Sequence, residues 1–427
     1  MKKTLLLMSI ISSLALANVE SIHIKDIFIP QDLKVSYSGK EAVFKKGFKI
    51  GVGSAITIKS VDENGELEFY ALTDRGPNGD IPTYLKNQKS IPGKFFPAPK
   101  FTPMIGILKT KNNESAVLVD KIEIKDKDGK KITGLPLPAG KMGSTGEIAL
   151  DMNMNELGYD VNGLDPEGIA VDKDGNFWIC DEYGPFILQL DNQGKILQKF
   201  EPGKGLPEIL KYRVPNRGFE GLTIDEEGNV YATVQSTLDV EGKTKDVANF
   251  TRVIKLNPET KEVETFAYPL DNGYKKNSAA KIGDICSLGD NKFLVIEQGK
   301  QNGKMQNLIY KVDFSNATDI TELENLEENS SQVDVKFGEK ELVLDLRNYG
   351  WTAEKAEGIT ILPDRKSIVV INDNDFGMIV EQNLEEYRYD GDSKKLYHNN
   401  EEIKESFTLK DNKEKSQVWL INLDKEL

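Results

Sequence analysis

Short apolar runs, separated by turn clusters rich in Asp, Asn and Gly, dominate the chain, and helical periodicity is scarce. For example, the cluster at 172–176 leads into Phe177-Trp178-Ile179-Cys180, and the cluster at 225–229 leads into Val230-Tyr231-Ala232-Thr233-Val234. Asp, Asn and Gly tolerate the positive φ that tight hairpin turns require. The pattern therefore predicts an all-β protein built from hairpins.

This hairpin pattern recurs along the chain, which indicates an internal repeat. Four clear copies and one weaker early copy run from Pro166, Phe219, Ile282, Ala356 and Gly53, and Met104 opens a sixth unit. The starts lie roughly 50 to 75 residues apart, the spacing of four-stranded propeller blades. We predict a single β-propeller of six blades. A seventh stays open, because residues 387–389 and 418–421 also read as strands.

Acidic residues stand at the two ends of these hairpins. Glu167, Glu220, Asp284 and Glu357 open the first strand of their copies, and Asp181 and Asp373 close the second strand. A hairpin returns the chain to its starting edge, so blades around one axis would bring these acids to one face. The alternative is that the acids only cap strands. We favour convergence, because four copies carry an acid in one register.

Charge and composition narrow the chemistry of such a site. The chain has 69 acidic and 55 basic residues, a net charge of −14, which disfavours nucleic acid and anionic membranes as partners and suits cation binding. Hard oxygen donors around a ring match calcium, which accepts six to eight oxygens in flexible geometry. Zinc and copper would recruit His or Cys. The predicted calcium ligands are Glu167, Glu220, Asp284, Glu357, Asp74 and Asp373.

Only two histidines occur, His23 and His398, and both are expected at the surface. A Ser-His-Asp hydrolase is therefore disfavoured. If the protein is an enzyme, Asp181 or Glu182 could accept a proton from a cation-bound water. Arg75 and Arg217 stand beside the hairpin ends and could bind a phosphate or carboxylate group. Alternatively, each forms an ion pair with a neighbouring acid.

The N-terminus has the pattern of an export signal. A positive start at Lys2 and Lys3, an apolar run to Leu16 and the small-residue site Ala15-Leu16-Ala17 predict a signal peptide over 1–17 and a propeller over 18–427. We expect a periplasmic or secreted monomer with no later membrane span. Cys180 and Cys286 could pair in an exported protein. We favour two buried thiols, because both cysteines lie in apolar runs.

Several segments together resemble the phytase-like family, described as having esterase-like activity of phytase. They are Asp74-Arg75-Gly76-Pro77-Asn78, Pro166-Glu167-Gly168-Ile169, Asp181-Glu182-Tyr183-Gly184-Pro185, Asn216-Arg217-Gly218-Phe219-Glu220-Gly221-Leu222 and Ala356-Glu357-Gly358-Ile359. The resemblance implies a calcium-associated propeller outside the cytoplasm and hydrolysis of phosphoesters or esters. A more distant likeness to regucalcin and paraoxonase propellers implies that Glu167, Glu220 and Glu357 are calcium ligands, with Asp284 less certain.

Two functions stay open at this point. One is a calcium-dependent hydrolase of phosphoesters or small esters, with its site at the acidic mouth of the propeller. The other is a non-catalytic propeller that binds a ligand or protein and uses calcium only to fix its structure. An open cation position beside Asp181 or Glu182 would favour the hydrolase.

Overall fold

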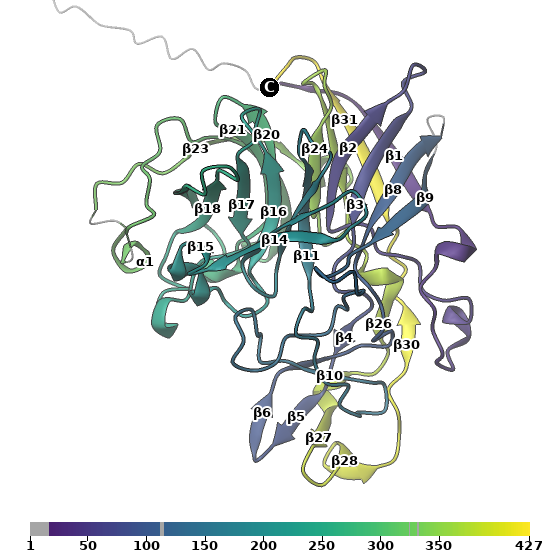
Figure 1. Cartoon of the computed structure of the whole chain (residues 1–427). Coiled ribbons are helices and arrows are strands. Elements are labelled where there is room, and N and C mark those ends of the chain that lie inside the picture. Colours follow the sequence, from purple (N-terminus) through teal and green to yellow (C-terminus); the bar gives the residue numbers. More distant parts are fainter. Residues whose placement is uncertain (1–16, 112–114, 324, 331–332) are drawn as a thin grey trace, which may run out of the picture.

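The computed structural model describes residues 17–111, 115–323, 325–330 and 333–427, and most of their regular structure is β-strand (Figure 1). Within them, the helices are short: α1 covers Leu326–Asn329, and 3₁₀ turns such as Glu208–Tyr212 and Leu346–Tyr349 connect strands. No helix among the described residues has the length and apolarity to cross a membrane.

Four antiparallel units of the fold each follow the chain in order. The first contains β2 (Ala55–Val61), β3 (Leu67–Leu72), β8 (Met104–Lys111) and β9 (Ser115–Glu123). The second contains β11 (Pro166–Val171), β12 (Phe177–Asp181), β13 (Phe186–Leu190) and β14 (Ile196–Pro202), extended by β15 (Gly205–Leu206). The third contains β16 (Phe219–Ile224), β17 (Val230–Val234), β18 (Phe250–Leu256) and β19 (Val263–Pro269). The fourth contains β20 (Lys281–Gly289), β21 (Lys292–Gln301), β22 (Lys304–Asp313) and β23 (Glu339–Asp345).

The fifth unit is assembled from both ends of the chain. Its strands, from the inside outward, are β24 (Gly358–Ile361), β25 (Ser367–Ile371), β31 (Gln417–Leu423) and β1 (Val19–Phe28). The N-terminal strand β1 pairs antiparallel with β31, and the two run side by side in Figure 1. The strand expected at 418–421 therefore does close the ring, but as part of this unit.

The innermost strands of these units form a closed ring. β2 packs on β11, β11 on β16, β16 on β20, β20 on β24, and β24 on β2. The all-β propeller is therefore confirmed, but the described residues form five blades, and the prediction of six is wrong. Met104–Lys111 does not open a blade. It is β8, the third strand of the first blade, and it pairs with β3. A long connection separates the two strands along the chain, so the apolar run of β8 resembles the start of a new repeat.

Three such connections leave the ring at the same end and build a cap of small sheets. They carry β4 (Gly79–Asp80), β5 (Thr83–Lys86), β6 (Lys89–Ile91) and β7 (Gly93–Phe95), then β10 (Ile148–Leu150), and finally β26 (Met378–Val380), β27 (Tyr387–Asp390), β28 (Lys395–His398), β29 (Glu401–Ile403) and β30 (Leu409–Asp411). The cap lies at the bottom of Figure 1. The expected strand at 387–389 is β27 of this cap and belongs to no seventh blade.

Apolar side chains fill the spaces between blades, which fixes the ring. Between the second and third blades, for example, Trp178, Leu222 and Val230 are buried in one cluster. All five residues of β12 and of β17 are buried, as expected for continuous apolar runs covered on both faces. Cys180 and Cys286 are buried free thiols, as favoured from the sequence.

Candidate functional site

An irregular start of two innermost strands, β11 and β16, turns one side chain of each toward the centre. In β11 the register shifts between Pro166 and Gly168, and in β16 it shifts between Phe219 and Gly221. The extra residue at such a bulge is re-aimed relative to the regular pleat. That residue is Glu167 in the second blade and Glu220 in the third.

The five equivalent positions differ in what they contribute. They are Ser54, Glu167, Glu220, Gly283 and Glu357, in blade order. Carboxylate oxygens of Glu167, Glu220 and Glu357 all lie within 4.8 Å of one another. These three glutamates are 6%, 2% and 7% exposed, so the group lies at a nearly enclosed centre. Three blades thus meet at one acidic point, as the sequence predicted.

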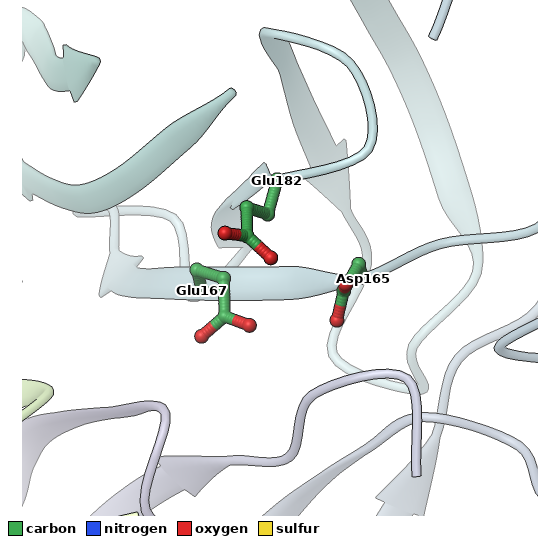
Figure 2. A group of neighbouring side chains, drawn as sticks. All are labelled: Asp165, Glu167 and Glu182. Carbon is green, nitrogen blue, oxygen red and sulfur yellow. The ribbon is translucent and has the colours of Figure 1, made fainter. Parts of the chain in front are cut away.

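A second acidic group shares Glu167 and adds Asp165 and Glu182. One carboxylate oxygen from each lies within 4.8 Å of the others. Figure 2 shows Asp165 and Glu167 at the start of β11, with Glu182 on the segment that follows β12. Asn216 Nδ2 and Gln235 Nε2 each donate to a different Glu182 oxygen, both at 2.8 Å. The Glu182 side chain is therefore fixed by two neutral donors.

Several oxygens at this centre have no hydrogen-bond partner among the described residues. They are Asp165 Oδ2, Glu167 Oε2, Glu220 Oε2 and the hydroxyl of Ser54. Arg75 Nε lies 3.4 Å from Asp165 Oδ2 as an ion pair without a hydrogen bond between these two atoms, while the backbone N–H of Arg75 donates to Asp165 Oδ1 at 3.0 Å. Buried polar atoms are normally satisfied. This set of unpartnered hard oxygens fits a divalent cation such as calcium.

Burial and mutual repulsion raise the pKa values of these carboxyls when no cation is bound. Burial, and then the charge of Glu220, raises the pKa of Glu167 well above its usual range. Burial, followed by Glu182 and Glu357, does the same to the pKa of Glu220. Burial raises the pKa of Glu357 to about 7, even though Lys355 and Lys281 oppose the shift. A bound cation would relieve this cost.

The described chain carries a family signature over the region that forms this centre. Residues 50–376 match the model of the family described as "Phytase-like: Esterase-like activity of phytase", more than half of the chain. The chain belongs to the phytase-like family.

A curated relative of this phytase-like chain comes from Arthroderma benhamiae. It is named "Uncharacterized secreted protein" and is 31% identical over 250 residues. The aligned region covers 48% of this chain and 48% of the relative, so the match spans about half the length of each.

Among solved structures, similarity is weak. A virginiamycin B lyase from Staphylococcus aureus has a TM-score of 0.31 at 10% identity, covering 82% of this chain and 96% of the lyase. A luciferin-regenerating enzyme has a TM-score of 0.34 at 11% identity, covering 88% and 94% of the two chains. The propeller assignment for the phytase-like chain follows from its own strand pairing.

Asp284 lies one residue beyond the bulge position of the phytase-like chain, which changes where its side chain points. Gly283 occupies that position, and a Cβ there would lie 2.2 Å from the Ala356 carbonyl oxygen. Because side chains alternate along a strand, Asp284 faces between blades. Its carboxylate accepts from the backbone N–H of Ile285 and of Ile359, both at 2.8 Å. It joins neither acidic group among the described residues and links β20 to β24.

Asp74 and Asp373 lie beside the centre in a separate network. Asp373 accepts from Lys355 Nζ at 2.7 Å, and Lys355 also lies 3.9 Å from Glu357. Asp74 accepts from the backbone N–H of Gly76 at 2.7 Å, and burial followed by the charge of Asp373 raises its pKa. Neither aspartate belongs to the two tight groups found among the described residues.

Asp181 is turned toward backbone. Its two oxygens accept from the N–H groups of Asp165 and Gly184, at 2.8 and 3.0 Å. These bonds place the segment that carries Glu182. Burial still raises the pKa of Asp181 to about 7.

The two arginines have different surroundings. Arg75 is 6% exposed, and its guanidinium lies 3.3 Å from Glu147 and 3.4 Å from Asp165. The ion-pair alternative therefore describes Arg75. Arg217 is half-buried and donates to the backbone carbonyl of Ser278.

Three charged residues near the centre escaped the sequence analysis: Asp165, Lys281 and Lys355. Asp165 precedes its strand, outside the aligned register, although it stands two residues before Glu167. Lys281 opens β20, and its charge lowers the pKa values of Glu182, Glu220 and Glu357 against the effect of burial. Lys355 stands two residues before Glu357, a short-range signal that could have been read.

Proposed function

We propose that this phytase-like protein is an exported hydrolase of phosphoesters or small esters that depends on a divalent cation, calcium, at the centre of its propeller. The family match over 50–376 and the secreted relative support hydrolysis outside the cytoplasm. The export pattern of residues 1–17 agrees with this placement, although residues 1–16 lie outside the described part of the chain. Calcium dependence and the site are part of the proposal.

The proposed site rests on one observation: carboxylate oxygens of three glutamates from three blades lie within 4.8 Å of one another, and two of these glutamates have a buried oxygen without a hydrogen-bond partner among the described residues. Glu167, Glu220 and Glu357 would hold the cation, with Asp165 and the Ser54 hydroxyl beside them. Calcium bound there would supply polarisation of a phosphoryl or acyl oxygen and a lower pKa for a bound water.

Glu182 is proposed as the general base. Burial, and then the charge of Asp165, raises the pKa of Glu182 to about 8. A general base transfers protons most effectively when its pKa lies near the working pH, and this value is close to neutral pH. Asn216 and Gln235 orient both of its oxygens. Asp181 positions this segment through backbone hydrogen bonds, and Arg75 positions Asp165 and Glu147.

Basic side chains near the centre that are not already paired with acids would attract an anionic substrate. Arg75 is engaged by two acids, which leaves Arg217 and Lys281 as the proposed contacts for a phosphate or carboxylate group. In the described part of the chain, Lys281 forms no salt bridge, and its charge acts on three of the site glutamates.

The test is hydrolysis of p-nitrophenyl phosphate and p-nitrophenyl acetate by purified protein, with calcium or with a chelator. We expect calcium-dependent turnover of at least one substrate. Glu182→Gln should lower kcat by about 100-fold or more, the usual contribution of a general base, while calcium binding measured by calorimetry persists. Glu63→Gln, in an exposed turn, is the matched control and should behave as wild type.

The burial of the centre supports a second candidate, a binding module with structural calcium. The three glutamates are only 2–7% exposed, so a cation bound to them would have few coordination positions open to a substrate or water. Tight calcium binding without turnover of a broad phosphate and ester panel would favour this candidate. Absence of calcium binding would remove the cation from both.

A further inference from the structure

A cavity of about 610 Å³ lies beside the first blade, and none of its lining residues comes from the five inner strands. One wall comes from residues 33–38, in the segment between β1 and β2, and another from residues 97–102, just before β8. β9 contributes Lys121 and Glu123. The volume falls within the range of small-molecule sites, about 300 to 1,000 Å³.

The cavity has a mixed lining, with apolar side chains on part of its wall. Its lining includes Leu33, Val35, Ile50, Phe101 and Met104. Ile50, Phe101 and Met104 are buried side chains of the main core cluster, on which Leu33 and Val35 pack. An aliphatic or aromatic body could therefore bury its surface there.

The wall formed by 33–38 is held in place before any ligand arrives. Val35 and Phe48 exchange backbone hydrogen bonds of 3.0 and 2.9 Å. The ring of Tyr37 packs 4.7 Å from that of Phe48, and its hydroxyl donates to Glu41 at 2.5 Å. A preformed wall reduces the ordering cost of binding.

The charged residues that line the cavity are mostly basic. Four lysines line the cavity, Lys34, Lys100, Lys121 and Lys131, against a single acid, Glu123. Lys131 neutralises Glu123 at 2.6 Å. The side-chain amines of Lys34, Lys100 and Lys121 form no salt bridge or hydrogen bond with any described residue. Three lysines without an acidic partner among the described residues thus line a partly apolar cavity in a protein of net charge −14.

We propose that this cavity binds an amphipathic organic anion, with an acyl-like body against the apolar lining and a carboxylate or phosphate head between Lys34, Lys100 and Lys121. Amines attract either head as point charges. None of the residues that line the cavity belongs to the acidic centre, so this site is separate from the proposed hydrolase site.

The test is calorimetry of the full protein with laurate and with dodecyl phosphate, each below its micelle concentration. We expect one-to-one binding of at least one, and the stronger of the two identifies the head group. Dodecyltrimethylammonium, which has the same chain and the opposite charge, should bind at least tenfold more weakly. Equal binding of the cationic and anionic probes would overturn the proposal.

Two sets of variants separate charge from packing. Lys34→Glu with Lys121→Glu should weaken anion binding at least tenfold, whereas Lys34→Arg with Lys121→Arg should retain it. Lys300→Glu, an exposed lysine outside the cavity, is the matched control and should bind as wild type. Ala98→Trp should block the cavity and abolish binding of both anions.

Thermal unfolding must show that every variant folds. Unchanged binding in the Lys34→Glu, Lys121→Glu variant, or in Ala98→Trp, would overturn the site. If one of these variants fails to fold, the other and the cationic probe still decide.

Discussion

Replacing Glu220 with Gln should have opposite effects on the metal-free and the calcium-bound protein. Glu220 is 2% exposed, and its Oε2 has no partner among the described residues. The substitution keeps the shape of the side chain but removes one ionisable group from the centre. In the metal-free protein this relieves repulsion, whereas in the calcium-bound protein it replaces a charged ligand with a neutral amide oxygen, a weaker calcium ligand.

The geometry sets the size of the effect. Two ionised carboxylates whose oxygens lie at most 4.8 Å apart repel by about 3 kcal/mol at an effective dielectric constant of about 20. Protonation relieves part of this, because the pKa values of Glu167 and Glu220 are raised. We therefore expect Glu220→Gln to increase the metal-free free energy of unfolding by about 1 to 3 kcal/mol at pH 8.

Calcium should stabilise the wild type more than the variant. A ligand at about 100 times its dissociation constant adds about 2.7 kcal/mol to the free energy of unfolding. Urea unfolding at pH 8, with calcium or with a chelator, gives all four values. Glu63→Gln, exposed and remote from the centre, should match the wild type in both conditions.

Full calcium-induced stabilisation of Glu220→Gln would show that the Glu220 carboxylate is not a calcium ligand. A variant that is less stable than wild type in chelator, by more than the Glu63→Gln control, would refute the predicted repulsion, since the buried carboxylate would then be a favourable group without a cation.

Two further predictions concern the pH dependence of stability and the hydrogen bond from Ile359 to Asp284 that links two blades. Burial raises the pKa of Glu357 to about 7 and that of Glu182 to about 8, so the folded metal-free protein holds more protons than the unfolded chain between about pH 5 and 8. The free energy of unfolding should therefore fall as pH rises through this window, by up to about 1.4 kcal/mol per pH unit for each group, and calcium should make it depend less on pH. Unfolding measured in chelator across this window tests the prediction. A rise in stability toward pH 8 would contradict it. Asp284→Asn should lower the free energy of unfolding by about 1 to 3 kcal/mol, because one backbone N–H of Ile285 or Ile359 loses its acceptor, yet leave calcium affinity within twofold. A large drop in calcium affinity in calorimetry would restore Asp284 as a ligand.

The local pattern was enough to predict the hairpins and the convergence of Glu167, Glu220 and Glu357. Each glutamate stands at the same place relative to a buried apolar run, and a hairpin must bring both ends to one edge. The blade count could not be predicted in this way. β8 carries the same apolar signal as an opening strand, and only its pairing with β3 assigns it to the first blade.

Asp284 shows a second limit of reading one strand at a time. The repeat aligns Asp284 with the glutamates, but a shift of one residue sends a side chain to the other face of a strand. The bulge position falls on Gly283, where the close approach of the Ala356 carbonyl leaves no room for a Cβ. That approach comes from the neighbouring blade.

The sequence by itself determined the all-β class, the repeated hairpin and the acids that meet at its end, because these depend on side-chain alternation and turn chemistry within a few residues. Tertiary structure alone decided that five blades close the ring, that β1 completes the last of them, and that Arg75 is engaged by Asp165 and Glu147. Those outcomes depend on contacts between segments tens to hundreds of residues apart, whose pairing is selected by packing and carries no local signature.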